Sequence, residues 1–176
     1  ASEARLASFV AIAQEQLPAQ HWFALRRQLR FVPRRQWQAG QGGTLADALT
    51  LKEHLRETRG KKFVLQWAWH PKALPTAVPA SGAIAAAQMG MDIVIARPPG
   101  YDLDPDDMKS ISSLAVARGG SVKVSDQIDD AVAGADAVYV KSWGSLEKFG
   151  RPDEERELRT PHRHWRMSAE RVRSTR

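Results

Sequence analysis

The chain has 176 residues, which suits a single domain large enough to bury a hydrophobic core without covalent cross-links. It contains no cysteine, and this excludes disulfides, thiolate nucleophiles and cysteine metal sites. No apolar run approaches the roughly 20 residues that span a bilayer, and no secretory signal peptide is visible. We therefore expect a cytoplasmic protein without a membrane partner.

The net charge of +6 is distributed unevenly along the chain. Residues 1–40 carry +4 and residues 151–176 carry +3, in both cases from arginine, whereas residues 41–150 carry −1. A nucleic-acid-binding domain normally builds its basic surface on the folded part. Binding of nucleic acid through the Arg-rich ends is therefore the weaker alternative.

Residues 1–43 form an Arg-rich N-terminal segment without a coherent pattern. A short amphipathic helix is plausible within residues 1–20, but residues 21–43 fit neither helix nor strand. The glycine-rich run at 40–43 resembles a phosphate loop, yet no strand precedes it and no Gly-Lys-Ser/Thr follows. We predict a turn there.

From Thr44 onward the pattern is regular. Thr44 and Asp47 resemble a capping box that opens a helix ending near Gly60. The following segments alternate between short apolar strands and helices, with strands at 63–67, 92–96, 122–124 and 137–140 and helices at 79–89, 105–118 and 126–133. Such alternation predicts an α/β fold, a doubly wound parallel sheet flanked by helices in a single Rossmann-like domain. We place this domain at residues 44–155, followed by an Arg-rich tail at 156–176 that packs poorly.

Two clusters of polar residues have structural interpretations. The first comprises Asp102, Asp104, Asp106 and Asp107. It lacks the glycine and glutamate that an EF-hand loop needs, and a helix cap at Asp104 with a charged first turn explains it better. The second, His162 and His164, has no third ligand at metal-site spacing and is predicted at the surface. Trp165 stands among arginines and is predicted either to pack against the domain or to belong to a disordered segment, rather than to stack on bases.

The candidate site begins where the strand at 137–140 ends. In open α/β sheets, ligands bind outside the carboxyl ends of the strands. There Lys141 supplies a cation, Ser142 a hydrogen bond, and Trp143 an apolar wall with one N–H donor. His70 follows the strand at 63–67 in the corresponding place, and it is either a ligand residue or a loop histidine without a partner. The plainer alternative is a strand followed by a turn, with Lys141 solvated and Trp143 packed.

Several segments together match a known family. They are residues 45–54, 60–65, 67–74, 90–92, 100–103, 134–136 and 139–144. On these segments, residues 44–167 resemble the second domain of the carbamoyltransferases, the half that binds the amino-acid substrate. His-Pro-Lys at 70–72 combined with Lys-Ser-Trp-Gly at 141–144 is similar to the N-acetylornithine and N-succinylornithine carbamoyltransferases.

The resemblance implies a reaction in arginine biosynthesis. The δ-amine of an N-acylated ornithine attacks the carbonyl carbon of carbamoyl phosphate, and phosphate leaves. The resemblance implies no metal or organic cofactor, and it implies that the enzyme is a homotrimer. It also implies that Lys141 contacts the acylated end or the carboxylate of the substrate. Ser142 and Trp143 then shape the pocket, and His70 and Ser81 lie nearby on the first loop and helix.

The chain also departs from the family. Family subunits are nearly twice as long, and the other half carries the Ser-x-Arg-Thr-Arg phosphate site. The family's His-Pro-x-Gln-Gly is replaced here by residues 40–44, and its Pro-Asn-Ser by Pro79-Ala80-Ser81. We therefore expect a chain that binds an N-acylornithine but does not catalyse by itself. A non-catalytic binding or assembly module of the same fold is the alternative.

Overall fold

The computed structural model describes residues 41–176, with side chains from Asp47 onward. Within this range four strands form one parallel sheet in the order β3-β2-β1-β4. They are β1 Lys62–Trp67, β2 Asp92–Ala96, β3 Val122–Ser125 and β4 Ala137–Lys141. The predicted parallel α/β sheet is thereby confirmed.

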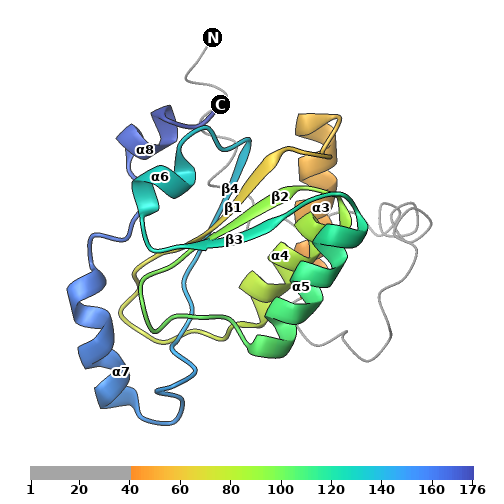
Figure 1. The fold of residues 1–176 in the computed structure, drawn as a ribbon. Coiled ribbons are helices and arrows are strands. Elements are labelled where there is room, and N and C mark those ends of the chain that lie inside the picture. Colours follow the sequence, from red (N-terminus) through yellow and green to blue (C-terminus); the bar gives the residue numbers. More distant parts are fainter. Residues whose placement is uncertain (1–40) are drawn as a thin grey trace.

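Helices cover both faces of the sheet, as expected for a doubly wound fold (Figure 1). One face carries α3 Gln41–Leu55, α4 Ala77–Gln88 and α5 Pro105–Ala117. The other carries α6 Ile128–Val132 and α8 Ala169–Arg173. Beyond the carboxyl ends of the strands lie α7 Pro152–Arg159 and a 3-10 turn at Thr160–His162. No helix among these has the length and apolar character needed to cross a membrane.

Strand β1 is the centre of the core. It pairs with β2 on one side and β4 on the other, and every residue from Phe63 to Trp67 is buried. Because helices cover both faces, the strand is a continuous apolar run rather than an alternating one. Gln66 is its polar exception, and it is fully buried with neither amide atom paired to another described residue.

Helix α4 is built from small residues. Ala83, Ala86 and Ala87 are fully buried, because the helix packs against α3, α5 and the sheet at once. A Cβ placed on Gly82 would lie 3.4 Å from the ring of Tyr139 on β4. Small side chains therefore let α4 approach the sheet closely.

The two predicted helix starts have different outcomes. Asp104 caps α5 as predicted, with its carboxylate accepting a hydrogen bond from the Asp106 N–H at 2.9 Å and Pro105 at the first position. The predicted capping box at Thr44 is wrong, because α3 already begins at Gln41 and Thr44 lies inside it. The turn predicted at 40–43 is likewise replaced by helix from Gln41; the rest of the N-terminal segment lies outside the described residues.

The expectation of poor packing in the C-terminal tail is wrong. Trp165 is only 3% exposed and joins the core, as its predicted packing role requires. The Gly134 N–H donates to the Ser174 carbonyl at 2.8 Å, which ties the tail to the start of β4. The predicted boundary at residue 155 falls within α7, and the division into domains stays a prediction.

Candidate functional site

Two loops meet at the carboxyl edge of the sheet, one following β1 and the other following β4. Trp67 and Lys141 are paired at the ends of these strands, and the Ala68 N–H donates to the Lys141 carbonyl at 2.9 Å. Further on, the Gly144 N–H donates to the Leu74 carbonyl at 2.8 Å. The structure thus places the loop carrying His70 and the loop that follows Lys141 side by side on one edge.

Lys141 supplies a cation to this edge at the end of β4, and its residue is partly exposed. Among the described residues, no carboxylate forms an ion pair with its ammonium group. The charge of Lys141 acts on Asp47 of α3. Burial raises the pKa of the Asp47 carboxyl above 3.8, whereas a hydrogen bond with Tyr139 and the charge of Lys141 lower it. Without an ion-pair partner among the described residues, the Lys141 ammonium group is available to an incoming anion.

Ser142 and Trp143 are buried and already hydrogen-bonded. The Ser142 hydroxyl accepts a hydrogen bond from the Arg159 guanidinium at 3.2 Å. The fully buried Trp143 indole donates to the Tyr101 carbonyl at 2.9 Å, and the Trp143 carbonyl accepts from the Trp67 indole at 2.9 Å. The N–H predicted as a ligand donor is thus already used, and Trp143 shapes the edge from within the core.

His70 and Ser81 flank this edge from the β1 side. The Lys72 N–H donates to His70 Nδ1 at 3.1 Å, so the ring closes a local turn and is not without a partner. Ser81 is partly buried on α4, next to Gly82, whose close approach to Tyr139 places this part of the helix over β4. All five predicted residues therefore belong to elements that meet near the ends of β1 and β4.

The residue that the sequence reasoning missed is Arg159, at the end of α7. Its side chain is almost fully buried, with the residue 1% exposed. The guanidinium forms an ion pair with Glu155 one turn earlier and donates to the carbonyls of His70 at 3.1 Å and Trp143 at 3.0 Å. The only sequence signal was the (i, i+4) spacing of Glu155 and Arg159 on a helix-prone segment.

Aromatic rings enclose this guanidinium. Arg159 lies 5.3 Å from the ring centroids of both Trp67 and Tyr101, within cation–π range. Burial raises the pKa of Tyr101 above its ordinary 10, with the Arg159 charge opposing and Glu155 adding to the shift. The phenol is therefore neutral at physiological pH. The edge rests on a desolvated layer of rings and one ion pair.

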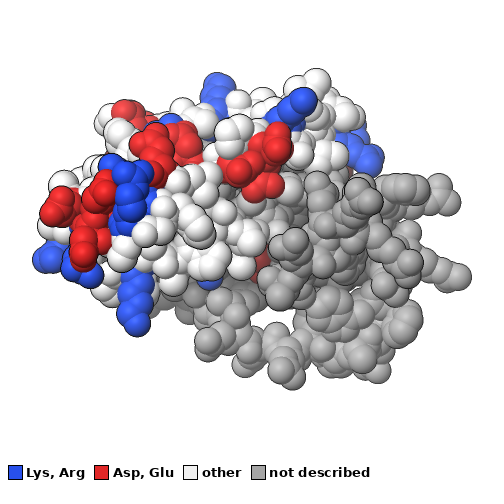
Figure 2. All heavy atoms as spheres, turned by 90° about the horizontal axis from the view of Figure 1, so that it is seen from below, with Lys and Arg blue, Asp and Glu red and all other residues white. Residues whose placement is uncertain are grey.

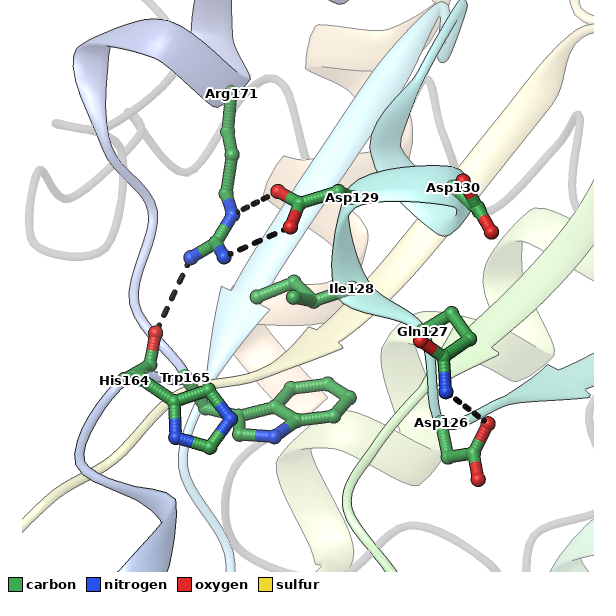
Figure 3. Close-up of a pocket in the computed structure, with 8 residues that line it drawn as sticks. All are labelled: Asp126, Gln127, Ile128, Asp129, Asp130, His164, Trp165 and Arg171. Atoms are coloured by element: carbon green, nitrogen blue, oxygen red, sulfur yellow. Dashed lines mark hydrogen bonds and ion pairs between the residues drawn. The ribbon is translucent and has the colours of Figure 1, made fainter.

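A separate hollow of about 390 Å³ lies between α6 and the C-terminal tail (Figure 3). Arg171 spans it, pairing with Asp129 at 2.6 Å and donating to the His164 carbonyl at 3.2 Å. The Arg171 hydrogen bond lowers the pKa of Asp129. None of the five predicted site residues lines this hollow, and its arginine is occupied in holding the tail.

The charge distribution bears on the nucleic-acid alternative. On the face shown in Figure 2, acidic and basic side chains of the described part lie close to one another. Two arginines of the tail form intramolecular ion pairs, Arg159 with Glu155 and Arg171 with Asp129. These two arginines are therefore already paired within the chain; the N-terminal arginines lie outside the described residues.

Over residues 47–176 the side chains do not group into a metal site. No set of three His, Asp or Glu side chains there is placed to hold a metal ion. His164 is exposed. His162 is partly exposed, and its ring packs edge-on against Trp67 and Tyr101. The reaction's independence from metals and cofactors stays a prediction.

Comparisons with known proteins place the chain in a family. The family model "Aspartate/ornithine carbamoyltransferase, Asp/Orn binding domain" matches residues 75–175. The chain is 47% identical over 124 residues to the N-acetylornithine carbamoyltransferase of Xanthomonas axonopodis pv. citri, covering 69% of this chain and 36% of that protein. It is 32% identical over 127 residues to the N-succinylornithine carbamoyltransferase of Bacteroides thetaiotaomicron, covering 71% and 34%.

Solved structures give the same result. The crystal structure of N-acetyl-L-ornithine transcarbamylase superposes with a TM-score of 0.73 at 43% identity, covering 75% of this chain and 41% of that one. Acetylornithine transcarbamylase complexed with acetylcitrulline superposes with a TM-score of 0.71 at 42% identity, covering 75% and 40%. The chain spans about a third of the length of the curated relatives it matches. By the match of the family model to more than half of its residues, this chain belongs to the aspartate/ornithine carbamoyltransferase family, in the part that forms the aspartate/ornithine-binding domain.

Proposed function

We propose that this chain is the amino-acid-binding domain of an N-acylornithine carbamoyltransferase of arginine biosynthesis. The observation that supports this most is Lys141, a cation without an ion pair among the described residues, at the carboxyl end of β4 beside the loop of His70. A half-buried anion needs a charged partner. Lys141 therefore binds the carboxylate or the acylated end of the amino-acid substrate.

The other four residues have distinct roles in this proposal. Ser142 and Trp143 are held in the layer beneath the edge and fix its shape. His70 and Ser81 line the side formed by the β1 loop and α4. N-acetylornithine is the substrate we favour, because the relatives of higher identity carry that name.

Catalysis needs a second component that binds carbamoyl phosphate. In the reaction, the ornithine δ-nitrogen bonds to the carbonyl carbon, the bond from that carbon to the phosphate oxygen breaks, and the amine gives up a proton. The phosphate requires several donors at once, and the chain matches only about a third of each curated relative. We therefore expect binding without turnover by this chain.

A turnover assay tests the second part of the proposal. The chain is incubated with carbamoyl phosphate and with N-acetylornithine, N-succinylornithine or ornithine, and citrulline-type product is measured colorimetrically. We expect none. Detectable product that scales with protein concentration would show that the chain is a complete enzyme and contradict the proposal.

A binding experiment tests the first part. N-acetylornithine is titrated into the labelled chain and followed by NMR, with Lys141→Ala and the control Lys148→Ala compared with the unmodified chain. Lys148 lies on the same loop but pairs with Glu154 at 2.9 Å. Lys141→Ala should weaken binding about tenfold, equal to about 1.4 kcal/mol, at unchanged stability, and Lys148→Ala should not. Equal effects of the two substitutions would mean that the edge acts only through its net charge.

The assembly-module alternative predicts no affinity for N-acetylornithine but a stable oligomer. Size-exclusion chromatography with light scattering measures the oligomeric state directly. The trimer that the family resemblance implies stays a prediction, and so does the cytoplasmic location expected from the sequence. Nucleic-acid binding would show an affinity that falls steeply with salt.

A further inference from the structure

We infer that Arg159 is a positioning residue, which holds the loops after β1 and β4 in one arrangement and thereby sets the affinity of the edge for an N-acylated ornithine. This inference rests on the proposed function, and it extends the site to α7. Arg159 has no role in the proposed chemistry, because the residue is only 1% exposed and its guanidinium is enclosed by protein.

The contacts of Arg159 join parts of the chain that are far apart in sequence. One guanidinium nitrogen donates to the His70 carbonyl at 3.1 Å and to the Ser142 hydroxyl at 3.2 Å. The other donates to the Trp143 carbonyl at 3.0 Å. Because the guanidinium is planar with donors in a fixed fork, these acceptors are fixed relative to one another. Ser142 directly follows Lys141, so this fork also limits where the lysine can lie.

Glu155 orients the fork from the opposite side. Its carboxylate accepts from Arg159 Nε at 3.1 Å with both oxygens, and the two residues are one turn apart on α7. The rings of Trp67 and Tyr101 lie 5.3 Å from the guanidinium carbon. Contacts with Glu155 and with the two rings therefore orient the Arg159 side chain independently of its hydrogen bonds to the loops.

Stability by itself does not explain such an arrangement. Replacing a buried ion pair by apolar residues of similar volume often leaves stability unchanged or increases it, whereas removing one partner is strongly destabilising. A double substitution can therefore keep the fold while removing every hydrogen bond to the loops. This separates positioning from stabilisation.

The test compares Glu155→Leu/Arg159→Met with a matched pair on the same helix, Asp153→Leu/Arg156→Met. Asp153 and Arg156 form an exposed ion pair at 3.1 Å that touches neither loop in the structure. Circular dichroism and thermal unfolding check the fold. NMR titration with N-acetylornithine gives the affinity, and hydrogen exchange of the Trp67 and Trp143 indole N–H groups reports on the order of the loops, independently of any ligand.

We expect a folded double variant with about tenfold weaker affinity, because apparent affinity falls in proportion to the population of the competent arrangement. The Trp67 indole proton, which shares the Trp143 carbonyl with Arg159, should exchange about tenfold faster. The exposed pair should change neither quantity. A folded double variant with unchanged affinity and unchanged exchange would overturn the inference.

Arg159→Lys serves as the second variant. It keeps the charge beside Glu155 but cannot satisfy all the acceptors, so it should also bind more weakly while folded. Retention of full affinity by a folded Arg159→Lys overturns the inference, as does failure of both variants to fold, since Arg159 would then be needed for the fold itself. If the unmodified chain does not bind N-acetylornithine, the proposed function fails, and the indole exchange decides separately whether Arg159 orders the loops.

Discussion

Replacing Gly144 by alanine should force the two loops of the binding edge apart. A Cβ at this position would lie 2.9 Å from the Cβ of Ala73, whereas ordinary contacts begin near 3.4 Å. The loops must therefore separate by about half an ångström, which also stretches the 2.8 Å hydrogen bond from the Gly144 N–H to the Leu74 carbonyl. The backbone of Gly144 does not have a positive φ, so the expected effect is steric.

The cost follows from these contacts. Overpacking of this kind typically costs about 1–3 kcal/mol, and a weakened backbone hydrogen bond contributes about 0.5–1.5 kcal/mol of the total. Ala73 is exposed, so its loop can move away from the new methyl group. We therefore expect a destabilisation of about 1–2 kcal/mol, at the lower end of the range for overpacking. For a chain of this size that corresponds to a fall in Tm of roughly 2–8 °C.

A second substitution tests the cause. Ala73→Gly removes the opposing methyl group and alone should cost about 0.4–1 kcal/mol through backbone entropy. In Ala73→Gly/Gly144→Ala the clash is absent, so the pair should show a favourable coupling of about 1 kcal/mol in a double-mutant cycle measured by urea unfolding. Purely additive effects would refute the steric reasoning. So would a Gly144→Ala variant that unfolds at the same denaturant concentration as the unmodified chain.

Two further substitutions test individual side chains. Burial raises the pKa of the Asp47 carboxyl above 3.8, so the folded chain binds the carboxyl proton more tightly than the unfolded chain does. The free energy of unfolding should therefore fall as pH rises from 3.8 through the folded-state pKa. Asp47→Asn should reduce that fall in urea unfolding series at increasing pH, and an unchanged slope would contradict it. Asp104→Ala should lose about 1 kcal/mol of unfolding free energy because it removes the cap of α5, whereas Asp104→Ser, which keeps an acceptor, should stay near the unmodified value; equal losses would exclude capping as the cause.

The strands could be predicted closely because their signal is local. The run at 92–96 has three β-branched apolar residues at its centre and lies between Gly90 and Pro98, and β2 occupies the same residues. The run at 137–140 becomes a strand one residue longer, ending at Lys141. Once parallel strands are assigned, the shared edge of His70 and Lys141 follows from topology.

The layer beneath the site could not be predicted in this way. The segment around Arg159 is dense in charge, and such segments usually form a solvated helix face. Its burial depends on acceptors 89 residues away at His70 and 17 residues away at Ser142, which no local pattern contains. The packing of the C-terminal tail could not be predicted for the same reason. Its packing depends on Trp165 and on the pairing of Arg171 with Asp129 across 42 positions.

The small residues of α4 restrict how the substrate preference of such a domain can change over evolution. A Cβ on Gly82 would lie 3.4 Å from the Tyr139 ring, and the alanines of α4 are buried toward the sheet. Larger residues on those positions would displace the helix, and with it Ser81, from the edge. If the proposed function holds, variation in the acyl group should arise mainly in the loops after β1 and β4. In the loop after β4, Leu146 and Phe149 are exposed and can be exchanged without repacking the core.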